Sequence, residues 1–230
     1  MFRMKNKLNN LYNANKEVKF ALVGAGKMGK GLVNQLSRIK GLTSSVVIDE
    51  KPEKDMEALI SSGVRKSDIT TSDNIKIIEN SIKNGMYVVS DDYSIACKLP
   101  DIKGVVDATG NPPFGAILAM EAIENRKHTI MLNVECDAVI GPYLYNLAKK
   151  KNVIYTGSAG DEPGAIMELT DFALGAGFKL LAVEKKKNNP LNYYITEDDV
   201  REEALSKGLY PKMLAGFIDG TNTMIELTSA

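Results

Sequence analysis

The chain has 230 residues, of which 44% are apolar, and its 29 lysines and arginines balance 29 aspartates and glutamates. A balanced charge gives no overall field to recruit nucleic acid or an anionic membrane, and no apolar run approaches the roughly 20 residues that cross a bilayer. The basic N-terminus lacks the apolar core of a signal peptide, and the two cysteines have no metal-ligand neighbours. We therefore expect a cytoplasmic protein with a small-molecule substrate, and neither nucleic acid nor a membrane as partner.

The first predicted strand, residues 18–23, runs directly into a GxGxxG turn that opens an amphipathic helix. In this spacing the first glycine permits a tight turn, the second lets the backbone approach a pyrophosphate, and the third lets helix and strand pack closely. The helix N-terminus offers free N–H groups to the phosphates. A second predicted strand, 45–48, ends in an aspartate placed to meet a ribose hydroxyl. The sequence thus predicts an NAD or NADP site formed by Gly24, Gly26, Lys27, Met28, Gly29 and Asp49.

The choice between the two cofactors depends on Asp49. Its carboxylate accepts hydrogen bonds from a ribose diol and repels a 2′-phosphate, which favours NAD. Lys51 and Lys54 lie close in sequence and would soften that repulsion. The sequence favours NAD by a narrow margin and leaves NADP open.

Strands and helices alternate as far as residue 156, which predicts a doubly wound parallel (Rossmann) sheet of α/β class over residues 1–156. Six strands are expected, and a helix over 137–150 that Gly141-Pro142 kinks or restarts. From residue 157 the regular alternation of strands and helices ends. A glycine-rich loop precedes a predicted helix, 178–183 is predicted to be a strand, and a last predicted helix runs from Pro211 to the chain end. We expect a smaller, incomplete α+β catalytic or dimerisation domain over 157–230, and a chain that is part of a longer or truncated protein.

Two loops follow predicted strands at the end of the sheet where such folds bind nucleotides. The first contains Ala108, Thr109 and Gly110, whose small residues would cover the nicotinamide half of the cofactor. A plain turn held by the following Asn-Pro is the alternative. The second loop supplies Asn133 to the cofactor and Glu135 to the chemistry, since Glu135 could bind a substrate hydroxyl, ligate a divalent cation or move a proton. Asp137 is equally a helix N-cap.

Further polar candidates lie in the second domain. Asp161 and Glu162 open its first helix, where an N-cap and first-turn role is the alternative to lining a cleft. On the last helix, Lys212 and Asp219 share a polar stripe that binds substrate, moves a proton or is simply solvated. Gly216 and Gly220 flank Asp219 and suggest the close approach of another group. The single histidine, His128, starts a strand, so no His-activated nucleophile is expected.

Five blocks carry a family resemblance: AxVGAGKMG, VVDATGNP, MLNVECDAVIGPYL, TGSAGDEPGAIMELTDFALGAGF and FIDGTNTMIEL. Together they resemble the homoserine-dehydrogenase-like oxidoreductases, and more closely the branch with 1-deoxy-D-xylulose 5-phosphate reductoisomerase-like enzymes, which often carry a SAF domain. The resemblance implies a Rossmann domain, a catalytic and dimerisation domain, NAD(P)H and a homo-oligomer. Homoserine dehydrogenases usually have an Asn-Lys pair where this chain has Asn133-Val134-Glu135, which weakens the homoserine interpretation.

These observations predict an NAD(P)-dependent oxidoreductase acting on a small hydroxy or carbonyl compound that resembles a sugar phosphate. A reductoisomerase-type reaction would use Mg²⁺ or Mn²⁺ bound to oxygen ligands such as Glu135 and Asp161. Metal or substrate contacts are expected from Glu135, Asp161 and Glu162. Substrate binding or proton transfer is expected from Lys212 and Asp219. Homoserine oxidation and a non-catalytic dinucleotide-binding domain are the alternatives.

Overall fold

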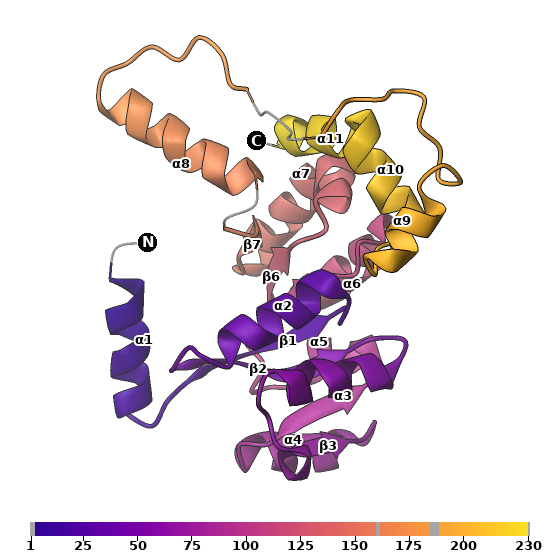
Figure 1. The fold of residues 1–230 in the computed structure, drawn as a ribbon. Coiled ribbons are helices and arrows are strands. Elements are labelled where there is room, and N and C mark those ends of the chain that lie inside the picture. Colours follow the sequence, from indigo (N-terminus) through magenta and orange to yellow (C-terminus); the bar gives the residue numbers. More distant parts are fainter. Residues whose placement is uncertain (1–2, 160–161, 185–188, 230) are drawn as a thin grey trace. The chain divides into compact units, whose positions relative to one another are not determined.

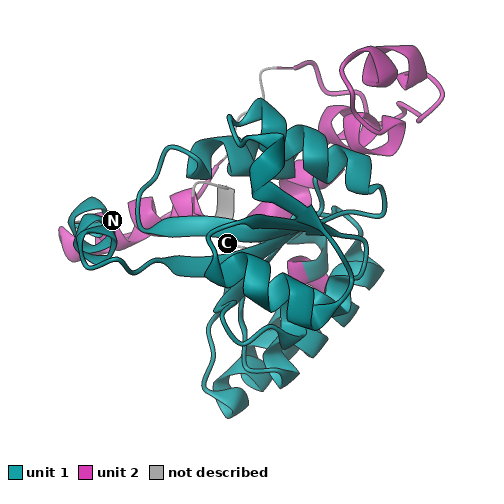
Figure 2. Cartoon of the chain, turned by 90° about the horizontal axis from the view of Figure 1, so that it is seen from below, with its two compact units in different colours: residues 1–136, 140–156 teal, residues 137–139, 157–230 magenta. Residues whose placement is uncertain are grey.

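The computed structural model describes residues 3–159, 162–184 and 189–229, and divides the chain into two compact units. The first unit contains residues 1–136 and 140–156, and the second contains 137–139 and 157–230 (Figure 2). Among the described residues, no helix has the length and apolar content needed to cross a membrane.

Seven strands of the described chain form one sheet in the order β3-β4-β2-β1-β5-β6-β7 (Figure 1). The pairs β1–β2, β1–β5, β2–β4, β3–β4 and β5–β6 are all parallel. This order, with β1 next to both β2 and β5, is that of a doubly wound sheet, as the sequence predicted. The strands are β1 (Val18–Val23), β2 (Leu42–Ile48), β3 (Ile69–Thr71), β4 (Tyr87–Ser90), β5 (Gly104–Asp107), β6 (His128–Met131) and β7 (Tyr155–Gly157).

Helices cover both faces of the sheet, which explains why its central strands are continuous apolar runs. Each face has its own apolar core. One core joins the strands to α4 (Ile75–Lys83), α5 (Tyr93–Lys98) and α6 (Pro112–Glu124), and the other joins them to α2 (Lys27–Leu36) and α3 (Pro52–Ser61). Along β1, Ala21 and Val23 face the first core while Phe20 and Leu22 face the second. The remaining helices of this unit are α1 (Met4–Asn13) and α7 (Val134–Lys151).

The first unit differs from expectation in two places. The short strand β3 was not predicted, because three residues, of which Ile69 and Thr70 are half-buried, give too little pattern for period-two alternation to show. The helix expected over 137–150 begins earlier, at Val134, and is continuous through Gly141-Pro142. A proline removes one N–H donor from a helix but does not have to end it. Asn133 is the N-cap of α7, so Asp137 lies inside the helix and the N-cap interpretation of Asp137 is wrong.

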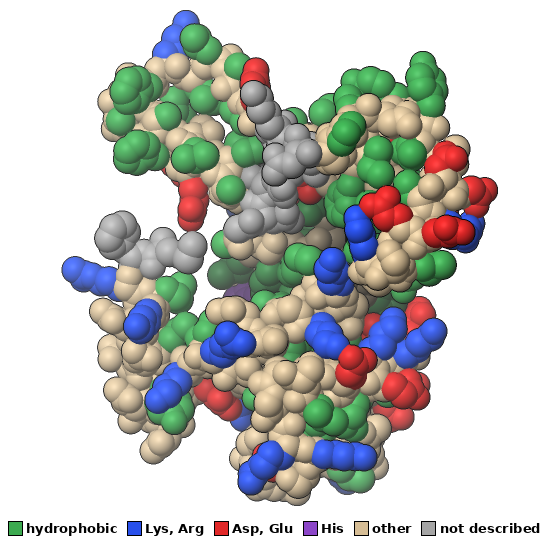
Figure 3. Space-filling model, viewed as in Figure 1, with side chains coloured by type: hydrophobic (Ala, Val, Ile, Leu, Met, Phe, Trp, Pro, Cys, Tyr) green, Lys and Arg blue, Asp and Glu red, His purple; other side chains and the backbone are tan. Residues whose placement is uncertain are grey.

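The described part of the second unit is helical, with α8 (Glu162–Gly175), α9 (Arg201–Ser206), α10 (Pro211–Asp219) and α11 (Thr221–Ser229). Residues 178–183, expected as a strand, have no regular secondary structure. Leu181 in this stretch is 86% exposed, and apolar residues line α8, where Leu169 and Phe172 are 70% and 75% exposed (Figure 3). A strand forms only when a neighbour takes up its backbone hydrogen bonds, and none does so here among the described residues.

Candidate functional site

The turn between β1 and α2 has the geometry that the glycine spacing predicts. Gly24 has φ +98°, and a Cβ added there would lie 2.7 Å from the Ala108 carbonyl carbon. At Gly29 an added Cβ would lie 1.9 Å from the Gly24 carbonyl oxygen, so helix and strand touch at this glycine. Gly26 is different: it is the N-cap of α2, and apart from its neighbours in the chain no protein atom lies within 4 Å of the position of an added Cβ. Two glycines are therefore required by packing, whereas Gly26 leaves open space before the helix N-terminus.

Lys27 and Met28 occupy the first turn of α2, and both side chains are exposed. The first N–H groups of a helix have no partner within it and attract anions. The open position at Gly26 thus lies next to backbone donors, which is the arrangement that a pyrophosphate requires. These residues fit a dinucleotide.

Asp49 follows β2 directly and its carboxylate connects two loops. Its Oδ2 accepts a hydrogen bond from the Ala25 N–H at 2.9 Å, and its Oδ1 accepts one from the Lys51 N–H at 3.1 Å. The Lys54 ammonium lies 3.4 Å from Oδ1, and the Asp49 side chain keeps 12% of its surface exposed. A carboxylate has about four acceptor positions, so these contacts leave room for hydroxyl donors while they fix the carboxylate beside the glycine turn.

The loop after β5 is held by hydrogen bonds to the carboxylate of Asp107, which is fully buried. Its Oδ1 accepts hydrogen bonds from the Thr109 N–H at 2.9 Å and the Thr109 hydroxyl at 2.7 Å. Its Oδ2 accepts a hydrogen bond from the Asn133 amide at 3.0 Å, and the same amide nitrogen donates to the Asn111 carbonyl at 3.0 Å. Ala108 itself donates its N–H to the Val23 carbonyl at the end of β1. The loop is thereby held against the glycine turn.

Asn133 is fully buried, and its side-chain oxygen accepts the Cys136 N–H at 3.3 Å as the N-cap of α7. Both ends of its amide are engaged within the protein, where the amide ties Asp107 and Asn111 to the start of α7. Its expected contact with a cofactor stays a prediction. Sequence reasoning singled out Asn133 and placed Asp107 at the start of the first loop without giving it a role, whereas the structure has Asp107 as the last residue of β5. A carboxylate at the last position of a buried strand is the signal that could have revealed it.

A close approach at Gly115 on α6 allows this network to form. A Cβ added at Gly115 would lie 2.3 Å from Asp107 Oδ2 and 2.5 Å from Asn133 Nδ2. Only glycine leaves space for the hydrogen bond between those two side chains. No sequence pattern marks this glycine, because its neighbours in space are 8 and 18 residues away along the chain.

Glu135 lies in the first turn of α7, two residues after Asn133, and is half-buried. It therefore stands at the same end of the sheet as the loop of Ala108, Thr109 and Gly110. The described residues contain no group of three or more His, Cys, Asp or Glu side chains that could hold a metal. Asp161, the second residue expected to bind a cation, lies outside the described residues. The expected Mg²⁺ or Mn²⁺ site stays a prediction.

The other expected residues belong to the second unit. Glu162 begins α8, Lys212 is exposed on α10, and Asp219 is half-buried at the end of that helix. The single helix expected from Pro211 onward is broken at Gly220, where φ is +88° and where Asp219 Oδ1 accepts the Thr221 N–H at 2.7 Å. Gly220 thus provides a left-handed helix end. At Gly216 an added Cβ would meet no atom of another segment within 4 Å, so no backbone approaches it among the described residues, and the approach of a ligand stays a prediction.

The single histidine has a structural role. His128 accepts the Ile154 N–H on Nδ1 at 3.0 Å, so it joins β6 to the segment before β7.

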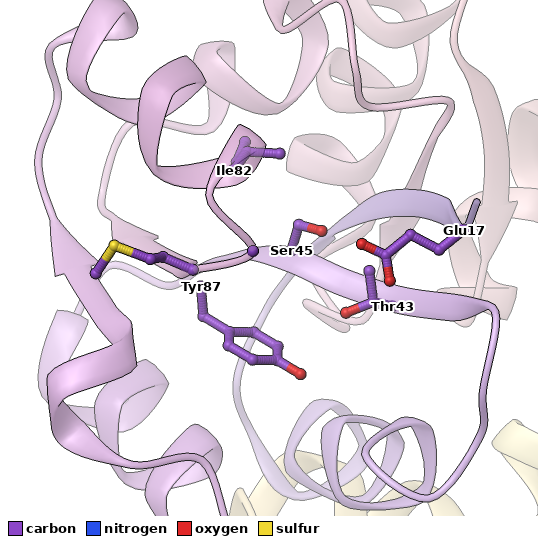
Figure 4. A pocket seen from close by; sticks show the side chains of 7 residues that line it. Glu17, Thr43, Ser45, Ile82 and Tyr87 are labelled. Atoms are coloured by element: carbon purple, nitrogen blue, oxygen red, sulfur yellow. The ribbon is translucent and has the colours of Figure 1, made fainter. Parts of the chain in front are cut away.

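A hollow of about 80 Å³ lies at the amino end of the sheet, lined by residues that include Glu17, Thr43 and Tyr87 (Figure 4). It is small and lies at the opposite end from the glycine turn, so it does not belong to the candidate site.

Comparisons with known proteins bear on both units. Residues 160–230 match the family model described as oxidoreductase DRL, catalytic domain. Solved structures of similar fold include a probable dehydrogenase from Thermotoga maritima, 14% identical with a TM-score of 0.50, covering 70% of this chain and 41% of that one. The WlbA dehydrogenase from Bordetella pertussis, in complex with NADH and UDP-GlcNAcA, is 15% identical with a TM-score of 0.50, covering 71% and 41%. No curated protein matches the sequence.

The chain spans about two-fifths of the length of these solved structures. At such low identity the likeness shows the fold alone, which is the predicted Rossmann-type α/β fold. The match of residues 160–230 to an oxidoreductase catalytic domain supports the enzyme class that the sequence predicted. The comparisons do not support the finer expectations of a homoserine dehydrogenase or a reductoisomerase.

Proposed function

We propose that the protein is an NAD-dependent dehydrogenase that oxidises or reduces a small hydroxy or carbonyl substrate. The observation that carries the proposal is the open space at Gly26, flanked by Gly24 and Gly29 in tight contact and by Asp49 bonded to the Ala25 N–H. This arrangement leaves the helix N-terminus free for a pyrophosphate. The oxidoreductase match over residues 160–230 supports a catalytic role beside the cofactor domain.

In this proposal the backbone of Gly24–Gly29 holds the pyrophosphate, with Lys27 and Met28 at its edge. Asp49 accepts the ribose hydroxyls of the adenosine half, which favours NAD because a 2′-phosphate would face its negative charge. Lys54, 3.4 Å from Asp49, reduces that repulsion, so NADP remains the weaker alternative. Ala108, Thr109 and Gly110, held by Asp107 and Asn133, cover the nicotinamide half. When bound, the cofactor supplies or accepts the hydride.

Glu135 is the residue of the first unit that we propose for the chemistry. It is half-buried at the ends of the strands, beside the loop of Ala108, Thr109 and Gly110. There a carboxylate can bind a substrate hydroxyl, or it can take the proton of that hydroxyl while hydride leaves the carbon that carries it. Glu162, Lys212 and Asp219, within the matched catalytic domain, are proposed to bind substrate or to move a proton. Asp161 is proposed alongside them from the sequence alone.

Within this class we infer a substrate that resembles a polyol or sugar phosphate, and homoserine is the alternative. The bound UDP-GlcNAcA of the WlbA dehydrogenase agrees with a sugar-like substrate for a protein of this fold. A panel of sugar phosphates and homoserine, assayed with and without Mg²⁺ or Mn²⁺, distinguishes the two. Metal-dependent turnover of a sugar phosphate favours the first, and metal-independent oxidation of homoserine favours the second.

A direct test of the proposed dinucleotide site places a methyl group in the open space at Gly26. In Gly26→Ala the new methyl group meets no protein atom within 4 Å, so the fold should persist while the pyrophosphate loses its close approach. We expect the Kd for NADH to rise about tenfold or more, with little change in the unfolding midpoint. Gly31→Ala is the matched control, because Gly31 lies on the same helix and its added Cβ also meets nothing. Equal NADH affinity in both variants would refute the proposed site.

A second test separates catalysis from cofactor binding. Glu135→Gln keeps the size of the side chain and removes its charge. We expect turnover to fall by about 100-fold or more while the Kd for NADH stays the same. An unchanged turnover number would remove Glu135 from the chemistry. Tight NADH binding without turnover of any substrate in the wild type would instead favour a non-catalytic dinucleotide-binding domain.

A further inference from the structure

Asp55, in the first turn of α3, is a carboxyl group buried beside the predicted ribose site. It is 0% exposed, and its Oδ2 accepts a hydrogen bond from the Asp49 backbone N–H at 3.0 Å. Its Oδ1 is also buried and has no hydrogen-bond partner among the described residues. Asp55 therefore accepts the hydrogen bond of the Asp49 backbone, while the Asp49 side chain accepts those of the Ala25 and Lys51 N–H groups.

The surroundings of Asp55 oppose a negative charge on it. Burial and then the nearby Asp49 carboxylate raise its pKa to about 8, and Glu53 adds to the rise, whereas the bond from the Asp49 N–H and the charge of Lys54 act in the opposite direction. Helix α2, which packs against α3, contributes Lys30, but that ammonium is paired with Glu57. The neighbouring strand β2 has no charged side chain, and β4 has only the phenol of Tyr87. At neutral pH Asp55 is thus mainly an uncharged acid.

We propose that Asp55 is a positioning residue for the adenosine end of the dinucleotide site: as a neutral carboxyl it holds the Asp49 backbone so that the Asp49 carboxylate can face the ribose diol. This inference rests on the proposed function, since it assumes that Asp49 binds the ribose. It goes beyond that function because the affinity for the cofactor then depends on the protonation state of Asp55, a residue that makes no contact with the cofactor in this proposal.

Ionisation of Asp55 should weaken cofactor binding. A second anion would then stand next to Asp49, and a bound cofactor would exclude the water that screens the two charges. If binding raises the pKa of Asp55 by about one unit, the Kd for NADH rises up to about tenfold as the pH increases from 6.5 to 9.5. NADPH adds a phosphate at the same place, so its Kd should rise more steeply than that of NADH.

The experiment is a titration of the 230-residue chain with NADH and NADPH at pH 6.5, 8.0 and 9.5, for the wild type, Asp55→Asn and Asp55→Leu. The Asn side chain keeps an oxygen that can accept the Asp49 N–H but cannot ionise. We expect its Kd for NADH to vary less than about twofold with pH. The Leu side chain removes the acceptor, so Asp55→Leu should bind NADH more weakly than Asp55→Asn at every pH. Circular dichroism melts establish that each variant is folded.

Two results would overturn the inference in distinguishable ways. If the wild type binds NADH with the same Kd at all three pH values, or if Asp55→Asn follows the wild-type profile, Asp55 has no such role and the dinucleotide site stands. If the wild type does not bind NADH at pH 6.5, the proposed function fails and the role of Asp55 fails with it.

Discussion

The sharpest prediction from the glycine turn concerns Gly29 and its neighbour Gly31 on the same helix. A methyl group added at Gly29 would lie 1.9 Å from the carbonyl oxygen of Gly24 and 3.5 Å from the Leu22 side chain. The first contact is with backbone, so no side-chain rotation can relieve it. A methyl group at Gly31 meets no atom within 4 Å. The two substitutions add the same atoms to one helix and differ only in what those atoms meet.

The expected magnitudes follow from these contacts. To reach an ordinary van der Waals distance at Gly29, α2 must move roughly 1.5 Å away from the Gly24 carbonyl that follows β1, and overpacking of this kind typically costs about 1–3 kcal/mol, occasionally more. Replacing an exposed helical glycine by alanine stabilises a helix by about 0.5–1 kcal/mol. Both substitutions share this gain in helix propensity, so the free energy of unfolding of Gly29→Ala should lie below that of Gly31→Ala by the overpacking cost alone, about 1–3 kcal/mol.

Urea unfolding followed by circular dichroism measures this difference, and NADH titration of the same samples measures its effect on the site. The separation of helix and strand moves the N–H groups of α2, so Gly29→Ala should also raise the Kd for NADH at least tenfold. Gly31→Ala should leave the Kd unchanged. If the two variants have the same unfolding midpoint, the close contact at Gly29 does not exist and the reasoning fails.

Three further predictions concern buried groups of the first unit. Gly115→Ala places a methyl group 2.3 Å from Asp107 Oδ2, so it should lower the free energy of unfolding by about 2–3 kcal/mol and weaken NADH binding; wild-type values for both in urea unfolding and NADH titration would contradict the network. Because folding raises the pKa of Asp55 from 3.8 to about 8, the native state retains a proton that the unfolded state loses, and stability falls as pH rises through that window. Relative to Asp55→Asn, the wild type should lose up to about 1.4 kcal/mol of unfolding free energy per pH unit between pH 5 and 7.5, and parallel profiles in urea would show that Asp55 is ionised when folded. Burial raises the pKa of the Cys97 thiol to about 12, and Cys136 is also buried, so Ellman's reagent at pH 8 should label both thiols only after denaturation; rapid labelling of the native protein would disprove their burial.

The parts of the fold that the sequence predicted correctly depend on local patterns. The apolar run of β1, the glycine spacing after it and the alternation of strands with helices all lie within short windows of sequence. The position of Asp49 directly after its strand depends on an equally short window, while its role toward a ribose stays a prediction. The pattern does not extend to residues 178–183, because an apolar stretch forms a strand only if a partner is present. Leu181, 86% exposed, shows that apolar character alone does not decide this.

The supporting residues of the candidate site could not be predicted in the same way, because they meet only in space. Asp55 supports Asp49 from six residues away, and Asp107 binds Asn133 across 26 residues. Neither pair has a spacing that marks a motif. The sequence instead drew attention to polar residues of predicted loops and helices, such as Lys212 and Asn133, and assigned no role to the buried carboxyl groups of Asp55 and Asp107.

The register of the sheet shows how one of these pairs could be inferred once the fold is known. In the parallel pair of β5 and β6, Asp107 stands opposite Met131. Both strands end there, so the residues just beyond Met131 lie beside the loop that begins after Asp107, and an amide at Asn133 is within reach of a buried carboxylate that needs a donor. The hydrogen bond of 3.0 Å between them therefore follows from strand order and the cost of an unpaired buried charge. Sequence patterns locate the glycine turn of the candidate site, whereas the residues that hold this turn and its neighbouring loop in place follow from the pairing of the strands.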